Sequence, residues 1–125
     1  MLLDTCALLW LAEGGRHLTP KARSGIESAP VLYLSAITGF EIGVKVQRRK
    51  LDLPMPVRAW LDAVVSHHRL SVVPLGLEEC VASTELPPIH QDPCDRFIIG
   101  TALAHRLPVV TADAVFREYG VEVVW

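Results

Sequence analysis

Short apolar segments alternate with longer amphipathic segments along the whole chain. The apolar segments read as strands that are almost continuously hydrophobic, as expected when helices cover both faces of a sheet. They cover residues 1–3, 31–34, 70–74, 108–111 and 121–124. Helical periodicity covers residues 7–13, 20–28, 37–51, 56–67, 77–85, 93–106 and 114–119. This order predicts an α/β fold, a three-layer α/β/α sandwich around a central, mainly parallel sheet of about five strands.

Composition sets the broad class of the protein. With 125 residues, half of them apolar and 21% charged, the chain is expected to fold as one domain over residues 1–125. No apolar run approaches the roughly 18 residues that a membrane span needs. The cysteines, Cys6, Cys80 and Cys94, lack zinc-site spacing and are an odd number for a disulfide framework. We therefore expect a cytoplasmic protein that is not associated with a membrane.

Charge is nearly balanced, with 12 basic and 14 acidic residues and a net charge of -2. The chain therefore lacks the overall positive field of a typical nucleic-acid binder, and any contact with RNA must be local. One dense basic run, KVQRRK, brings Lys45, Arg48, Arg49 and Lys50 to the end of a predicted helix. Cations are favoured there by the helix dipole, so the run is explained equally well by a solvated helix end or by phosphate contacts.

Four acidic residues are predicted to gather at one edge of the sheet. Asp4 follows the first strand, Asp113 follows the fourth, and Glu41 and Asp95 lie near the starts of their helices. Ligands of open parallel sheets bind beyond the carboxyl ends of the strands. These four side chains are therefore the candidates for a functional site.

Each of these acids also has a purely structural explanation. Asp113 would cap the helix that follows it, and Asp92 followed by proline and Asp95 is typical of a helix N-terminus. Glu41 precedes Lys45 by four residues, which is the favourable order for a surface ion pair. Taken one at a time, capping and pairing are sufficient.

The helical pattern argues that the acids face inward instead. Asp95 lies on the apolar stripe of its helix, and Glu41 borders a stripe formed by Ile37, Phe40 and Val44. Carboxylates brought within about 4 Å repel by roughly 4 kcal/mol per pair at an effective dielectric of 20, so a cluster must bind protons or a cation. Oxygen-only ligands favour Mg²⁺ or Mn²⁺ over zinc.

The histidines and cysteines are not expected to hold a metal. The five histidines are scattered, and His90 is expected to be a turn residue held by a backbone hydrogen bond. A zinc site of His90, Asp92 and Cys94 lacks recognised ligand spacing. Cys6 and Cys94 each sit beside a candidate acid and are expected to be small buried hydrophobic residues.

The segments that carry the acids are LLDTCALLW, SAITGFEIG, HQDPCDRFIIGTALAH and VVTAD. In this order they resemble the four signature stretches of the PIN-domain family, and specifically its VapC-type bacterial toxins. The resemblance spans the chain and maps the metal-binding acids to Asp4, Glu41, Asp95 and Asp113. It places a second set of residues in supporting positions: Thr5, Ser35, Asp92, Arg96 and Thr111.

This resemblance implies an endoribonuclease that needs Mg²⁺ or Mn²⁺, forms a homodimer and is inhibited by a VapB-like antitoxin that inserts a segment into the cleft. Bound metal would be expected to activate water for attack on phosphorus, leaving 5′-phosphate and 3′-hydroxyl ends. Arg96 would orient the carboxylate of Asp95 or contact a phosphate, and the first role is the more common one for a neighbour of a metal ligand. Thr5 and Thr111 would either donate hydrogen bonds to nearby carboxylates or serve as helix-entry residues, and the sequence favours neither role.

Two other readings remain at this stage. A phosphatase-like α/β hydrolase would use the aspartate after the first strand as a nucleophile, but the segment DTC lacks the second acid that dehalogenase-like enzymes carry two residues later. A PIN-fold interaction domain without catalytic activity would not need four intact acids, because packing gains nothing from an uncompensated cluster.

Overall fold

The computed structural model describes all residues, 1–125, and contains one five-stranded sheet. The strands are β1 (Leu2–Leu3), β2 (Tyr33–Ser35), β3 (Ser71–Val73), β4 (Val109–Val110) and β5 (Val123–Val124). All neighbouring pairs are parallel, in the order β3-β2-β1-β4-β5. The predicted parallel sheet is therefore confirmed, with each strand shorter than its apolar segment.

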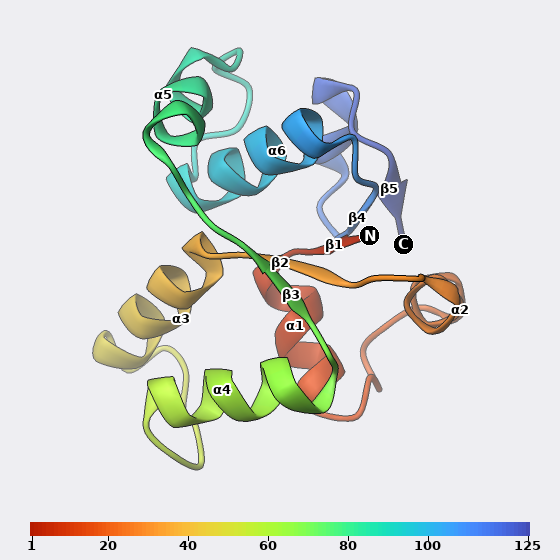
Figure 1. Cartoon of the computed structure of the whole chain (residues 1–125), viewed down its shortest axis with the longest axis vertical. Helices are drawn as coiled ribbons and strands as arrows, with labels where there is room; N and C mark the ends of the chain where they lie inside the picture. The colour runs from red at the N-terminus through yellow and green to blue at the C-terminus, as the bar shows by residue number, and fades with distance from the viewer.

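Helices cover both faces of this sheet (Figure 1). They are α1 (Thr5–Ala12), α2 (Pro20–Ser28), α3 (Ile37–Gln47), α4 (Val57–His67), α5 (Leu77–Glu85), α6 (Pro93–His105) and the 3₁₀ helix η1 (Ala114–Tyr119). The pleat of β1 sends Leu3 into a core with α1, α2 and α4, and Leu2 into a second core with α6 and η1. Both side chains are fully buried, so the sheet is apolar on both faces, as the three-layer prediction requires.

The strand order places a crevice beside β1. After β1 the chain builds β2 and β3 on one side, and it then crosses to the other side of β1 to build β4 and β5. A reversal of this kind separates the loops that follow β1 and β4, and ligands of open α/β sheets bind at that point. Asp4 follows β1 directly, and Asp113 lies three residues after β4.

Within two residues of their last helical residue, α3, α4 and α6 are each followed by an arginine in the left-handed backbone region. The φ values are 54° at Arg49, 51° at Arg69 and 53° at Arg106. In α3 the Lys50 N–H returns to the Lys45 carbonyl, which closes a Schellman turn. The predicted helix 37–51 was therefore too long. Glycine normally occupies the left-handed position, so a sequence with arginine there gives no stop signal.

None of the helices is both long and apolar enough to cross a membrane.

Buried and exposed leucines predict different costs for the same substitution. Leu8 is fully buried on α1, whereas Leu77 is 82% exposed on α5. Leu8→Ala should lower the free energy of unfolding by about 2–5 kcal/mol, because it removes buried apolar surface and leaves a cavity. Leu77→Ala should change it by less than about 0.5 kcal/mol. Guanidinium unfolding measures both values, and equal losses from the two variants would contradict the described core.

Candidate active site

Asp4 is the buried centre of the acidic cluster. It follows β1, caps α1 by accepting the Ala7 N–H at 2.6 Å, and is only 6% exposed. The Thr111 side chain, at the end of β4, also hydrogen-bonds this carboxylate, as expected for a supporting threonine. Burial, with a smaller contribution from repulsion by Glu41 and Asp113, nevertheless raises the pKa of Asp4 to about 6. Capping and clustering are thus both features of the same side chain.

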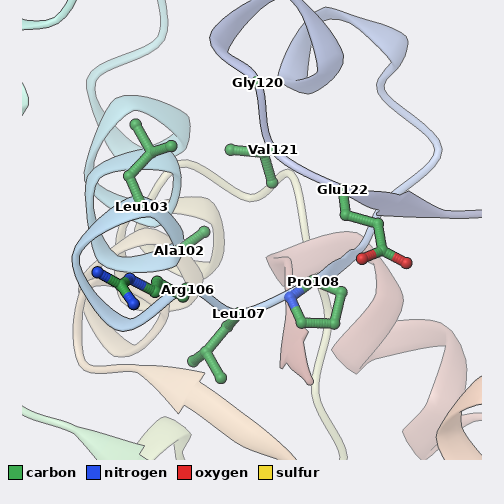
Figure 2. A pocket seen from close by; sticks show the side chains of 8 residues that line it. All are labelled: Ala102, Leu103, Arg106, Leu107, Pro108, Gly120, Val121 and Glu122. Atoms are coloured by element: carbon green, nitrogen blue, oxygen red, sulfur yellow. The ribbon is translucent and has the colours of Figure 1, made fainter.

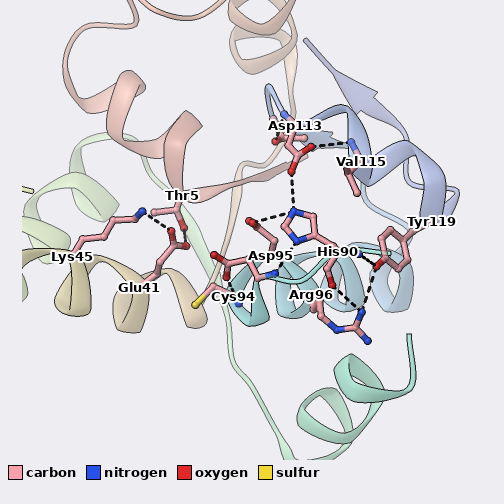
Figure 3. Close-up of polar contacts among 12 residues, drawn as sticks. Thr5, Glu41, Lys45, His90, Cys94, Asp95, Arg96, Asp113, Val115 and Tyr119 are labelled. Atoms are coloured by element: carbon pink, nitrogen blue, oxygen red, sulfur yellow. Dashed lines mark hydrogen bonds and ion pairs between the residues drawn. The ribbon is translucent and has the colours of Figure 1, made fainter. Parts of the chain in front are cut away.

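Glu41 reaches the cluster from α3. Its Oε2 accepts a hydrogen bond from the Thr5 hydroxyl at 2.5 Å, and its Oε1 pairs with Lys45 at 3.2 Å (Figure 3). The expected i,i+4 ion pair is therefore present. The carboxylate of Glu41 is also bonded to Thr5, which directly follows Asp4 in the chain. Ser35 acts one turn earlier, where its hydroxyl accepts the Ile37 N–H at the start of α3. Ser35 thereby supports the helix start and not a carboxylate.

Asp95 and Asp113 are joined by a histidine. His90 Nε2 lies 2.8 Å from Asp113 Oδ2 and 3.3 Å from Asp95 Oδ2 (Figure 3). His90 Nδ1 accepts the Asp92 N–H at 3.1 Å, so in the neutral ring Nε2 carries the hydrogen and donates a hydrogen bond to Asp113. Asp113 Oδ1 also accepts the Val115 N–H, which starts η1. The three side chains form a group whose ligand atoms all lie within 4.8 Å of one another.

His90 was expected to be a turn residue, and the structure brings its ring to the candidate acids as well. Its backbone N–H does bond the Tyr119 hydroxyl at 2.6 Å. Its ring, however, reaches Asp113 across 23 residues of sequence, a contact that local pattern does not reveal. The only sequence signal was its position two residues before the helix-capping Asp92.

Asp95 is the acid whose ionisation costs most. Its pKa is raised to about 7, mainly by burial and further by repulsion from Asp92, Glu41 and Asp4, while attraction to His90 opposes the shift. Asp95 was expected to lie on the inward stripe of its helix, and it is half-buried there. A carboxyl with this pKa is only partly ionised at neutral pH unless a cation is bound.

Arg96 does not orient Asp95, contrary to expectation. Its guanidinium donates to backbone carbonyls of Leu86 at 2.7 Å and Pro87 at 2.8 Å, and to others between residues 83 and 90. Neighbours on a helix project about 100° apart, so Arg96 points away from the carboxylate of Asp95. Together with the Tyr119 hydroxyl, which donates to Pro87, Arg96 braces the loop that carries His90 (Figure 3).

Asp92 serves as the helix cap that its sequence context suggested. Its Oδ1 accepts the Cys94 N–H at 2.8 Å at the start of α6. His90, Asp92 and Cys94 do not form a ligand group, which agrees with their lack of zinc-site spacing. Cys6 is exposed and Cys94 is half-buried, so the expectation that both are buried was wrong.

The structure thus brings the four predicted acids to one crevice as two coupled halves. Asp95 and Asp113 share His90, while Asp4 and Glu41 lie outside that group and are held by threonines from the two sides. The mutual repulsion that raises the pKa of Asp4 and Asp95 shows that the halves act on each other. Carboxylates at this density can bind a hard divalent cation.

One pocket on the surface of the protein lies away from the acids. It has a volume of about 250 Å³ and lies between the end of α6 and the start of β5 (Figure 2). Its lining includes Leu103, Pro108 and Val121, with Arg106 and Glu122 at its sides. It opens at the amino ends of the strands, on the edge of the sheet opposite the acids, and contains no candidate chemistry.

Comparison with known proteins identifies the family. The family model described as "PIN domain" matches residues 1–122. The chain is also 32% identical over 122 residues to Ribonuclease VapC22 of Mycobacterium tuberculosis, an alignment that covers 95% of this chain and 91% of that protein.

Solved structures share the fold at lower identity. The chain superposes with a TM-score of 0.69 and 16% identity on VapBC2 from Rickettsia felis bound to a DNA fragment from its promoter, covering 98% of this chain and 95% of that one. It superposes with a TM-score of 0.68 and 22% identity on FitAcB from Neisseria gonorrhoeae, covering 99% and 96%. The site geometry, the matching family model and the full-length relative lead to one conclusion: this chain belongs to the PIN domain family.

Proposed function

We propose that this chain, as one domain over residues 1–125, is a divalent-metal-dependent endoribonuclease and the toxin of a type II toxin–antitoxin pair. The observation that carries the proposal is the convergence of Asp4, Glu41, Asp95 and Asp113 at the carboxyl edge of a PIN-fold sheet. The ribonuclease activity is supported by the name of the relative at 32% identity. The antitoxin partner is supported by the structural neighbours, which are toxin–antitoxin complexes.

The chemistry of the donors fits Mg²⁺ or Mn²⁺. All four acids offer oxygen ligands, and burial together with repulsion from neighbouring acids raises the pKa of Asp4 and Asp95, so that both carboxylates gain from a bound cation. Lys45 neutralises only Glu41. A bound divalent ion would supply Lewis-acid activation of water and of the phosphodiester. His90 provides a nitrogen ligand or an outer hydrogen bond, and both roles keep Asp95 and Asp113 together.

The chain itself contributes orientation. Three of the acids receive a side-chain hydrogen bond: Thr5 holds Glu41, Thr111 holds Asp4, and His90 holds Asp113. The fourth, Asp95, lies 3.3 Å from the same His90 nitrogen. These donors restrict the carboxylates before any substrate arrives, which lowers the reorganisation needed at the reacting phosphate. Arg96 and Tyr119 in turn fix the loop that carries His90, through hydrogen bonds to its backbone.

We propose a homodimer as the free toxin and a complex with a VapB-like antitoxin as its inhibited state. An antitoxin segment that enters the crevice would meet an excess of negative charge, so a basic side chain on that segment would be favoured.

Replacement of the acids tests the catalytic role. Asp95→Asn and Asp113→Asn should each lower the rate of RNA cleavage in Mn²⁺ by at least about 100-fold, because several kcal/mol of charge stabilisation are lost. Asp52→Asn, an exposed acid outside the site, is the matched control and should cleave like wild type. Cleavage of total RNA is followed on gels, with circular dichroism to check the fold. Full activity of Asp95→Asn, or a wild-type protein that cleaves no RNA with either metal, would contradict the proposal.

His90 should act through the carboxylates. His90→Ala should weaken Mn²⁺ binding or cleavage by about 10- to 100-fold, since it removes the group shared by Asp95 and Asp113. His90→Gln retains an N–H near the position of Nε2 and should recover part of the loss. Calorimetric titration with Mn²⁺ and cleavage rates measure both effects. Equal behaviour of wild type and His90→Ala would show that the histidine is only a turn residue.

The pKa of Asp95 predicts the pH dependence of stability. Its folded-state pKa of about 7 lies above the ordinary value of 3.8, so the folded state binds more protons between these values and stability falls as pH rises through the window. Asp95→Asn should match wild type at pH 4 and exceed it at pH 7.5 by on the order of 2 kcal/mol in metal-free buffer. Denaturant unfolding at both pH values measures the difference. A variant less stable than wild type at pH 7.5 would contradict the shift.

A further inference from the structure

A groove of about 410 Å³ adjoins the acidic crevice, and all of its lining residues except Glu41 lie outside the proposed metal site. Phe40, Lys45 and Arg48 line it from α3, and Lys50 lines it from the turn that follows. Glu41 belongs to both the groove and the metal site, so one opens directly onto the other. The opposite wall is the start of α6, formed by Asp92, Pro93 and Cys94. Figure 3 shows Lys45 and Glu41 extending from α3 toward Thr5.

The basic end of this groove is built by the turn after α3. The hydrogen bond from the Lys50 N–H to the Lys45 carbonyl folds the chain back, so that Lys50 joins Lys45 and Arg48 along one wall. Lys45 is paired with Glu41, but no carboxylate lies within 4.0 Å of the charged groups of Arg48 or Lys50. Two unpaired cations therefore face the groove of a chain whose net charge is -2.

Phe40 is exposed beside these cations. The helical pattern placed it on an inward stripe, yet 64% of it is accessible, whereas Phe116 is fully buried. An apolar ring of this size normally gains stability from burial. Phe40 instead lines the groove one residue before Glu41, with Arg48 two turns further along the same helix. An aromatic face beside unpaired cations is the arrangement that binds single-stranded nucleic acid, since bases stack on the ring and phosphates pair with the cations.

We infer that this groove binds the RNA strand next to the scissile phosphodiester, with a base stacked on Phe40 and backbone phosphates at Arg48 and Lys50. The inference rests on the proposed ribonuclease function, and it adds a binding site for the part of the RNA that flanks the cleaved bond. A phosphodiester held at the acids requires the adjoining nucleotides to continue over the surface next to Glu41, and this groove is that surface. From Phe40 to Arg48 the helix rises about 12 Å, which accommodates more than one phosphate.

Binding is measured without cleavage, by fluorescence anisotropy of a labelled single-stranded RNA oligonucleotide of mixed sequence in EDTA. Phe40→Ala should weaken binding by roughly 5- to 150-fold, and Phe40→Trp should retain it, because stacking needs only an aromatic face. An oligonucleotide with abasic sites should bind wild type weakly and lose most of its sensitivity to Phe40→Ala. The double variant Arg48→Ala/Lys50→Ala should reduce the slope of log affinity against log salt by about 1.4, since two phosphate contacts are removed.

Matched controls remove the same chemistry elsewhere. Leu77→Ala deletes an exposed apolar side chain, and Arg16→Ala/Lys21→Ala deletes two exposed cations remote from the groove. Both controls should bind RNA with nearly wild-type affinity. Wild-type RNA affinity in Phe40→Ala, together with an unchanged salt slope in Arg48→Ala/Lys50→Ala, would overturn the inference. If the same variants instead lost only the antitoxin, the groove would be a protein-binding surface and the inference would be equally wrong.

The inference and the proposed function fail in distinguishable ways. Mn²⁺-dependent cleavage by wild type, with RNA binding unaffected by the groove variants, leaves the ribonuclease in place and removes the subsite. Absence of cleavage by wild type removes the proposed function whatever the groove binds.

Discussion

The burial of mutually repelling carboxylates is the constraint on which the site depends. Four acids from separate parts of the chain converge at the carboxyl edge of the sheet, and two of them, Asp4 and Asp95, have pKa values raised to about 6 and about 7. A fold does not gain stability from such a cluster, so its retention points to a ligand that compensates the charge. A divalent cation meets that requirement and supplies the chemistry that phosphodiester hydrolysis needs.

The fold tolerates the unfavourable clustering of the carboxylates because rigid helices and strands position each acid. The crevice lies where the strand order reverses beside β1, and both faces of β1 and β4 are packed in apolar cores. Thr5 and Thr111 tie two carboxylates to the start of α1 and the end of β4. The loop between α5 and α6, which carries His90, is held by Arg96 instead. The Arg96 guanidinium donates hydrogen bonds to backbone carbonyls of this loop, and these bonds keep His90 near Asp95 and Asp113.

Sequence reasoning was reliable where local pattern decides the outcome and failed where it does not. The parallel sheet and the edge that carries the acids follow from apolar strands alternating with helices, and both are present. The end of α3 was missed because Arg49 takes a position that glycine usually occupies. His90 was missed because its partner Asp113 is distant in sequence. Phe40 was assigned inward because helical periodicity does not show where the neighbouring elements leave a groove open.

The most direct test of the central claim is calorimetric titration of the metal-free protein with Mn²⁺ at pH 6.5, in two buffers that differ in ionisation enthalpy. The account predicts binding with release of protons, because Asp4 and Asp95 are partly protonated at that pH and must ionise to act as ligands. Heats that differ between the buffers would show this release. Absence of Mn²⁺ binding, or binding without proton release, would contradict the claim that the acids form an uncompensated cluster awaiting a cation.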